Sequence, residues 1–152
     1  MAAPALVARV AAAQATIDAF HHKMFEWGKY DCCRLAAHLL KGMGHRPNLT
    51  RFGYYRSELA ATKALKRLGF DDTVDVVDAL GFQRIPPASA LPADLCGLRT
   101  VDRRGLSGLA VFIGQGRLLG FLDEDGLCHA FEPHGLLAGA EQIAWRCDPC
   151  PN

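Results

Sequence analysis

The sequence has almost no excess of charge of either sign. Its 152 residues hold 17 Lys and Arg against 16 Asp and Glu, a formal net charge of +1. Because a dedicated nucleic-acid-binding protein normally carries a basic surplus, we expect no direct contact with nucleic acid. No segment reaches the ~20 apolar residues that a membrane-spanning helix needs, so we also expect no membrane span.

Internal repeats and low-complexity linkers are absent as well. Half of the residues are hydrophobic, which is too many for a disordered chain. A chain of this length can bury a core of its own. We therefore expect one globular domain over residues 1–152, with residues 147–152 as a Cys-x-x-Cys tail extension.

A basic segment before the first apolar residues is also lacking, and Arg9 interrupts the apolar run. This pattern is typical of a helix and not of a secretory signal. We therefore expect the chain to be made in a reducing cytoplasm, where cysteines are buried small side chains, nucleophiles or metal ligands. The six cysteines are Cys32, Cys33, Cys96, Cys128, Cys147 and Cys150.

Helix signals occupy the first half of the chain. Asp31, Ser57 and Asp72 each stand where a side chain can cap a following helix. A first helix is predicted upstream of them, with Arg9 on its polar side. Its apolar face comprises Leu6, Val10, Ala13, Ile17, Phe20 and Met24.

The second half has the pattern of short strands. Residues 109–114 and 117–122 are apolar runs bounded by glycines, and Asp125-Gly126 is a strong hairpin signal before residues 127–131. A last strand is predicted at residues 143–146. Helices followed by an antiparallel sheet indicate an α+β domain.

Residues 25–33 form the segment that most strongly indicates chemistry. They place Cys32 in the first turn of a predicted helix, where backbone amides and the helix dipole lower the pKa of a thiol. Cysteine peptidases use such a cysteine with a histidine from elsewhere in the fold as base. The alternative is that Cys32 and Cys33 are two small side chains packed in a core.

These residues resemble the nucleophile segment of NlpC-type papain-like cell-wall peptidases, in which Trp-Gly is followed by Asp-Cys. Residues 91–95 resemble the lead-in to a strand in that family, and residues 108–114 resemble the strand itself. The resemblance implies a papain-like helical half packed on a small antiparallel sheet, with Cys32 as the nucleophile. It also puts Gly108 at the position of the base, and glycine cannot accept a proton.

A longer set of segments resembles a tail-assembly family of tailed phages, prophages and gene transfer agents. This resemblance implies a structural component of a tail tip or baseplate hub, with a degenerate and inactive peptidase-like domain. Its partners would be other tail-tip or hub proteins, and it would reside in the virion tail. The segments are residues 25–28, 31–33, 53–55, 68–70 and 124–127.

An active enzyme is the alternative that the same resemblance leaves open. It would be a murein-degrading thiol peptidase or amidase that acts on peptidoglycan during genome delivery. Such an enzyme needs a base, which His129 or His134 could supply only if the fold brings one of them beside Cys32. The His21-His22 pair is explained by its place at a helix end, where a cation interacts well with the dipole.

Cys147 and Cys150 form the second candidate site. Two thiolates at this spacing can hold zinc or an iron–sulfur cluster, which would make the chain a metal-binding assembly module. A complete site would need further ligands from this chain or from a partner. A disulfide formed after release and a mobile tail are the other interpretations. Apart from this pair, we expect no cofactor.

An aromatic cluster lies near the expected cleft in the sequence. It could shape a groove for peptide or sugar, anchor an interface, or simply pack in the core. Its members are Phe25, Trp27, Tyr30, Tyr54 and Tyr55.

Overall fold

The computed structural model describes residues 4–100, 105–121, 125–133 and 140–151. The helices are α1 (Ala5–Phe20), α2 (Cys32–Gly42), α3 (Glu58–Arg67) and α4 (Thr73–Ala79), with short 3₁₀ turns η1 (Leu49–Phe52) and η2 (Pro87–Ser89). The strands are β1 (Gln83–Ile85), β2 (Leu95–Thr100), β3 (Gly108–Gly114), β4 (Arg117–Gly120), β5 (His129–Phe131) and β6 (Ala140–Arg146).

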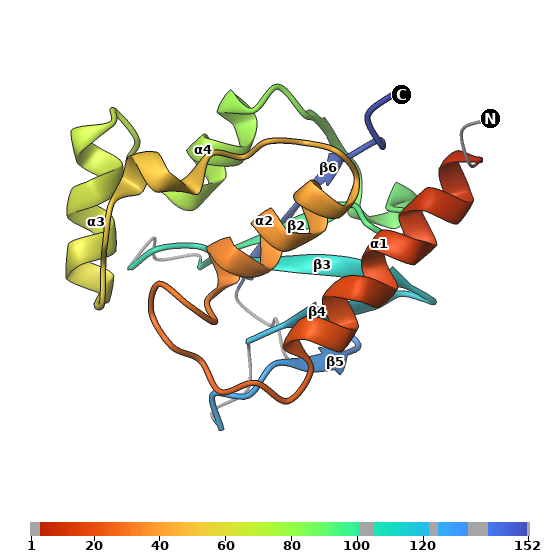
Figure 1. Cartoon of the computed structure of the whole chain (residues 1–152), viewed down its shortest axis with the longest axis horizontal. Coiled ribbons are helices and arrows are strands. Elements are labelled where there is room, and N and C mark those ends of the chain that lie inside the picture. Colours follow the sequence, from red (N-terminus) through yellow and green to blue (C-terminus); the bar gives the residue numbers. More distant parts are fainter. Residues whose placement is uncertain (1–3, 101–104, 122–124, 134–139, 152) are drawn as a thin grey trace.

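The strands form one sheet in the order β1-β6-β2-β3-β4-β5, and every neighbouring pair is antiparallel (Figure 1). The predicted α+β class is therefore confirmed. The last strand, β6, lies inside the sheet, where it pairs with both β1 and β2. The sequence pattern did not predict β1 as a strand, because it is only three residues long and is followed by two prolines, which disrupt regular structure.

The three predicted helix caps are confirmed. The Asp31 side chain accepts a hydrogen bond from the Arg34 amide at 2.8 Å, and the Ser57 hydroxyl accepts one from the Ala60 amide at 3.1 Å. Asp72 caps α4 in a reciprocal arrangement with the third helical residue. Each cap provides a partner for amides that the first helical turn leaves unpaired.

The main core lies between the sheet and helices α1 and α2, which cross one face of it (Figure 1). Leu35 and Leu39 of α2 are fully buried there. Trp145 of β6 is also fully buried, and its indole N–H donates to the Asp78 carboxylate at 2.8 Å. A second apolar cluster on the other face comprises Cys96, Leu98, Ala110, Phe112, Leu118, Phe131 and Ala144.

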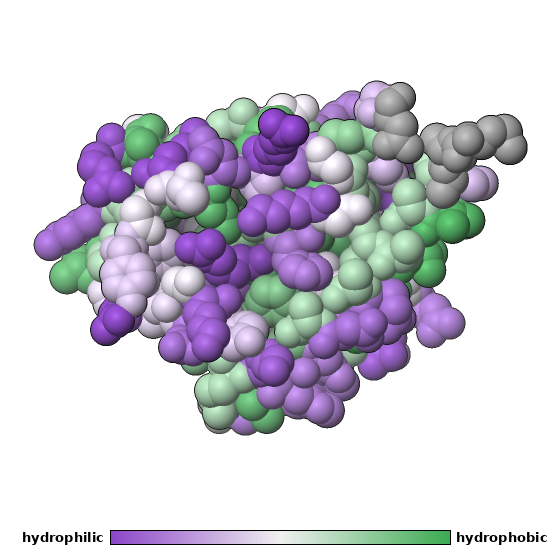
Figure 2. All heavy atoms as spheres, in the orientation of Figure 1, coloured by the Kyte–Doolittle hydropathy of each residue, from purple (hydrophilic) through white to green (hydrophobic). Residues whose placement is uncertain are grey.

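The predicted inward face of α1 is wrong at its N-terminal end. Leu6 and Val10 are 59% and 52% exposed, whereas Arg9 is only 2% exposed. Arg9 turns inward because it pairs with the buried carboxylate of Asp94, a partner far away in the sequence. Figure 2 shows the resulting apolar surface over this end of α1. Within the described ranges, no helix is long and apolar enough to cross a bilayer.

Candidate functional site

Cys32 is the first residue of α2, at the end of a tight loop wrapped around Asp31. The Gly28 amide donates to Asp31 Oδ2 at 2.7 Å, and the Arg34 amide donates to Oδ1 at 2.8 Å. Gly28 has φ +78°, and a Cβ there would lie 2.8 Å from the Tyr55 carbonyl oxygen. Only glycine fits this position, and it allows the loop to place Cys32 at the helix start.

Asp31 is almost completely buried, at 1% exposure. The Tyr55 hydroxyl lies near this carboxylate and is affected by its charge. Burial raises the pKa of Tyr55 far above its usual value, and the charge of Asp31 adds to this effect. Tyr55 therefore stays uncharged beside this buried carboxylate, which accepts hydrogen bonds from the Gly28 and Arg34 amides.

Cys32 and Cys33 are adjacent, and each thiol shifts the pKa of the other. The Cys33 thiol is the largest influence on Cys32 and lowers its pKa, with help from the Leu109 backbone, while burial and Asp31 act in the opposite direction. The Cys32 thiol, together with burial, raises the pKa of Cys33 well above its ordinary value. The pair thus favours a thiolate at Cys32 and a neutral thiol at Cys33. The sequence had indicated only a small packed side chain for Cys33.

A pocket of about 220 Å³ opens beside these two cysteines. Its walls come from α2, α3, α4 and the start of β3, and most of the lining side chains are apolar. Gly108, the first residue of β3, lines the pocket together with Cys32 and Ser107. Among the described residues, no histidine contributes to the lining. The position opposite the thiol therefore offers no proton acceptor of the kind that cysteine peptidases use.

Ser107, next to Gly108, is engaged in structure. Its amide donates to Asp72 at 2.8 Å, its hydroxyl donates to the other oxygen of Asp72, and its carbonyl accepts from the Thr73 hydroxyl at 2.7 Å. These contacts fasten the start of β3 to the start of α4. They fix the backbone on the pocket wall and add no base to it.

His129 lies on β5 and does not line the pocket. Its Nε2 is 3.0 Å from Asp125 Oδ2, and its ring contacts those of His21 and His22. Burial, followed by the charges of the two other histidines, lowers the pKa of His21. His134 lies outside the described residues. The structure thus groups His129 with the pair at the end of α1, an association that the sequence did not predict.

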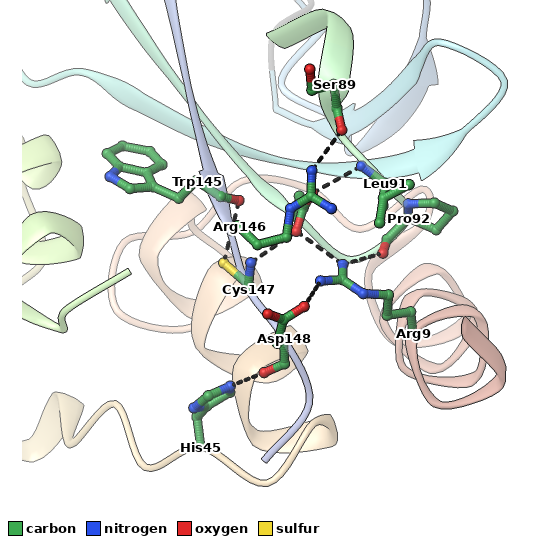
Figure 3. A network of polar contacts seen from close by, with 10 residues as sticks. Arg9, His45, Ser89, Leu91, Pro92, Trp145, Arg146, Cys147 and Asp148 are labelled. Atoms are coloured by element: carbon green, nitrogen blue, oxygen red, sulfur yellow. Dashed lines mark hydrogen bonds and ion pairs between the residues drawn. The ribbon is translucent and has the colours of Figure 1, made fainter. Parts of the chain in front are cut away.

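The C-terminal residues pack against the rest of the fold (Figure 3). Arg9 donates to Asp94 Oδ1 at 2.9 Å and to Asp148 Oδ1 at 2.6 Å. The Cys147 amide donates to the same Asp94 oxygen at 2.8 Å, and Arg146 lies 3.4 Å from the other one. The buried ion pair of Arg9 with Asp94 joins α1 to the start of β2, and the contacts of residues 146–148 with these two side chains hold the end of β6 against it. The interpretation of a mobile tail is therefore wrong at these residues.

The two cysteines of the tail lie in different surroundings. Cys147 is fully buried, and burial raises its pKa to about 12. Cys150 Sγ is 3.2 Å from Nδ1 of His45, whose Nε2 contacts the Asp148 carbonyl at 2.7 Å. All six thiols are free, and within the described ranges no cluster of three metal-ligating side chains includes Cys147 or Cys150. A metal or cluster held by this pair stays a prediction.

The aromatic cluster divides between the pocket and other sites. Phe25, Trp27 and Tyr55 line the pocket and contact one another edge to face. Tyr30 packs on Phe20, and the Tyr54 side chain is exposed. Three of the five aromatic side chains therefore form part of the pocket beside Cys32.

Comparisons with known proteins assign a family to the chain and support its fold. Residues 7–135 match the family described as "Domain of unknown function (DUF6950)". The chain belongs to this family. A solved structure, "Structure of NlpC1 from Trichomonas vaginalis", is similar to the DUF6950 chain with a TM-score of 0.60 and 13% identity. A comparison with curated proteins found no match.

The similarity to the NlpC1 structure concerns the fold. It covers 96% of this chain but only 45% of that protein, so this chain spans less than half of its structural neighbour. An NlpC-like fold is thus established for this member of the DUF6950 family. Activity and assembly are separate questions, because site residues and not folds determine them.

Proposed function

We propose that this chain is a non-catalytic, NlpC-type domain that serves as a structural component of a phage-type tail tip or baseplate hub. The observation that carries the loss of catalysis is Gly108, which faces the same pocket as Cys32 and has no side chain. The resemblance of residues 25–33, 53–55 and 68–70 to the tail-assembly family supports the location. Its partners are other tail-tip or hub proteins.

The lack of a histidine among the described residues of the pocket matters because a thiolate alone performs only part of amide hydrolysis. A peptidase needs a group that donates a proton to the leaving amine, which is the second task of the histidine. The Cys33 thiol favours the thiolate of Cys32 but supplies no group of suitable pKa for this step. The side chains on the pocket wall therefore fit a scaffold better than a hydrolase.

A complementation experiment tests the structural role. The gene is deleted from a phage or prophage that carries it. Either the native gene or a gene encoding the Cys32→Ala variant is then supplied. We expect both versions to restore complete tails and infectivity equally, and the native protein to be found by mass spectrometry in purified tails. Restoration by the native gene alone, or absence of the protein from tails, contradicts the proposal.

The second candidate, a murein-degrading thiol peptidase or amidase, is favoured by one observation, the lowered pKa of Cys32. It predicts that the purified chain releases soluble fragments from peptidoglycan and that Cys32→Ala abolishes the release. Cys150→Ser is the matched control, because this thiol lies outside the pocket. Release of fragments by the native chain and the control, but not by Cys32→Ala, establishes the enzyme.

A further inference from the structure

Three histidines meet on the surface where α1 ends. One ring nitrogen from each of His21, His22 and His129 lies within 4.8 Å of those of the other two. The rings of His21 and His22 are stacked with centroids 3.7 Å apart, and the ring of His129 stands edge-on to His22 at 5.4 Å. In the described part of the chain, this is the one cluster of three metal-ligating side chains.

Backbone hydrogen bonds hold the histidines together across the sequence. The His22 amide donates to the Cys128 carbonyl at 2.9 Å, and the Cys128 amide donates to the Lys23 carbonyl at 3.0 Å. These two bonds fasten the turn after α1 to the residue that precedes His129. The placement of the three histidines therefore depends on main-chain geometry.

The conformation of His22 is unusual. Its φ of +66° lies in the left-handed region, which is strained for a residue with a Cβ. Glycine would occupy this position without strain. The turn instead carries an imidazole, which it stacks on His21.

A carboxylate supports the third ring. Asp125 Oδ2 lies 3.0 Å from Nε2 of His129, and Asp125 Oδ1 accepts from the Leu127 amide at 2.9 Å. Metal-binding histidines characteristically have such a carboxylate on one ring nitrogen, because it fixes the ring and makes it a better ligand. Arg117 also places a positive charge near His21.

We propose that His21, His22 and His129 together bind one divalent transition-metal ion of the zinc class. Imidazole nitrogens suit Zn²⁺, Ni²⁺ and Cu²⁺, and they bind zinc at about 2.0–2.1 Å. His21 and His22 are exposed, so their rings can turn and close the gap to that distance. Three protein ligands leave a fourth position for water or for a ligand from a partner protein.

The ion would link two parts of the fold that lead to the Cys32 pocket. His21 and His22 begin the loop that ends at Asp31, and His129 belongs to the edge strand β5. A metal ion bound to these residues would restrain the beginning of this loop, and the helix cap at Asp31 restrains its end. This role is independent of whether the chain is a scaffold or a hydrolase.

Zinc titration of the full chain, kept reduced and followed by calorimetry, tests the site. We expect one Zn²⁺ per chain and a loss of affinity of at least about 10-fold in both His22→Gly and His129→Ala, the range typical for disturbed metal sites. Glycine suits the φ of His22, so this variant removes a ligand and keeps the fold. Asp125→Asn is expected to weaken binding by less than either ligand substitution.

The free thiols require a control, because they also bind zinc. His45→Ala removes the histidine next to Cys150 and should leave the affinity unchanged. Co²⁺ provides a second measure, since thiolate ligands produce a strong near-ultraviolet charge-transfer band and three imidazoles do not. The proposal is overturned if no saturable binding occurs, if His22→Gly binds zinc like the native chain, or if the bound Co²⁺ shows the thiolate band.

Discussion

Cys32 and Cys147 each lie beside a buried aspartate, yet their surroundings drive the two thiols in opposite directions. Asp31 accepts hydrogen bonds from the Gly28 amide in the preceding loop and from the Arg34 amide in the first turn of α2. Cys32 lines a pocket, and the neighbouring Cys33 thiol lowers its pKa. Asp94 instead pairs with Arg9, and Cys147 is enclosed next to it. The pKa of Cys32 falls, and that of Cys147 rises to about 12.

The comparison shows that a nearby charge does not decide the state of a thiol by itself. Arg9 lowers the pKa of Cys147, but burial outweighs it. Asp31 raises the pKa of Cys32, but the Cys33 thiol and the Leu109 backbone outweigh it. Direct donors to the sulfur and access to solvent therefore matter more here than the sign of the neighbouring side chain.

The largest expected difference between the two regions is chemical reactivity. The pKa of Cys32 lies below the ordinary 9.0 and that of Cys147 is about 12, so at neutral pH Cys147 holds at least about 1,000-fold less thiolate. We expect iodoacetamide to modify Cys32 in the folded chain and to leave Cys147 unmodified. Peptide mass spectrometry after timed labelling measures this. Equal labelling rates for the two would contradict the comparison.

The next largest effect is expected from Arg9→Met. It leaves the carboxylate of Asp94 buried with Arg146 as its remaining cationic partner, and breaking a buried pair from one side costs about 3 kcal/mol or more. Urea unfolding followed by circular dichroism should show this loss. Asp148→Ala is the matched control. Its side chain is 75% exposed, so its pair with Arg9 should contribute less than about 1 kcal/mol.

A smaller loss is expected from Asp31→Ala at the other aspartate. This change removes the helix cap and leaves the Gly28 and Arg34 amides without their carboxylate, which should lower the free energy of unfolding by about 2 kcal/mol. Asp31→Asn keeps one oxygen acceptor and should lose about half as much. A greater loss than in Arg9→Met would reverse the order of the two regions.

The smallest effect concerns the titration of Cys32. Cys33→Ala removes the thiol that most lowers the pKa of Cys32, so the pH midpoint of Cys32 alkylation should move upward. Cys33→Ser retains a donor and should keep the midpoint close to the native value. The rate of iodoacetamide labelling across pH, read on the Cys32 peptide, distinguishes the two. A midpoint that is unchanged in Cys33→Ala would show that the helix start alone sets this pKa.

The Cys32 region could be predicted from sequence because its causes are local. Asp31 caps the helix only three residues before Arg34, and Gly28 lies in the same loop. The order of helix and strand patterns gave the α+β class, and the resemblance to NlpC-type peptidases gave the NlpC-like arrangement and the pairing of Cys32 with the strand that begins at Gly108. The coupling of Cys33 to Cys32 was missed, because adjacent cysteines in a helix do not reveal whether their thiols touch.

The Arg9 region could not be predicted, because its partners are distant in the sequence. Arg9 stood in a helix whose apolar spacing directed it to solvent, and only the fold brings Asp94 and Asp148 to it. The same limitation hid the association of His22 with His129. In both cases the determining contacts are hydrogen bonds between segments whose own patterns carry no sign of one another.

The position of β6 has a consequence for how the protein is made. Ribosomes deliver the chain from its N-terminus, so β1 and β2 emerge long before residues 140–146 and wait with unpaired backbone edges that face each other. Exposed strand edges invite pairing with other chains. During synthesis the molecule therefore passes through an interval in which its sheet is divided, and β6 closes the sheet once it has been made.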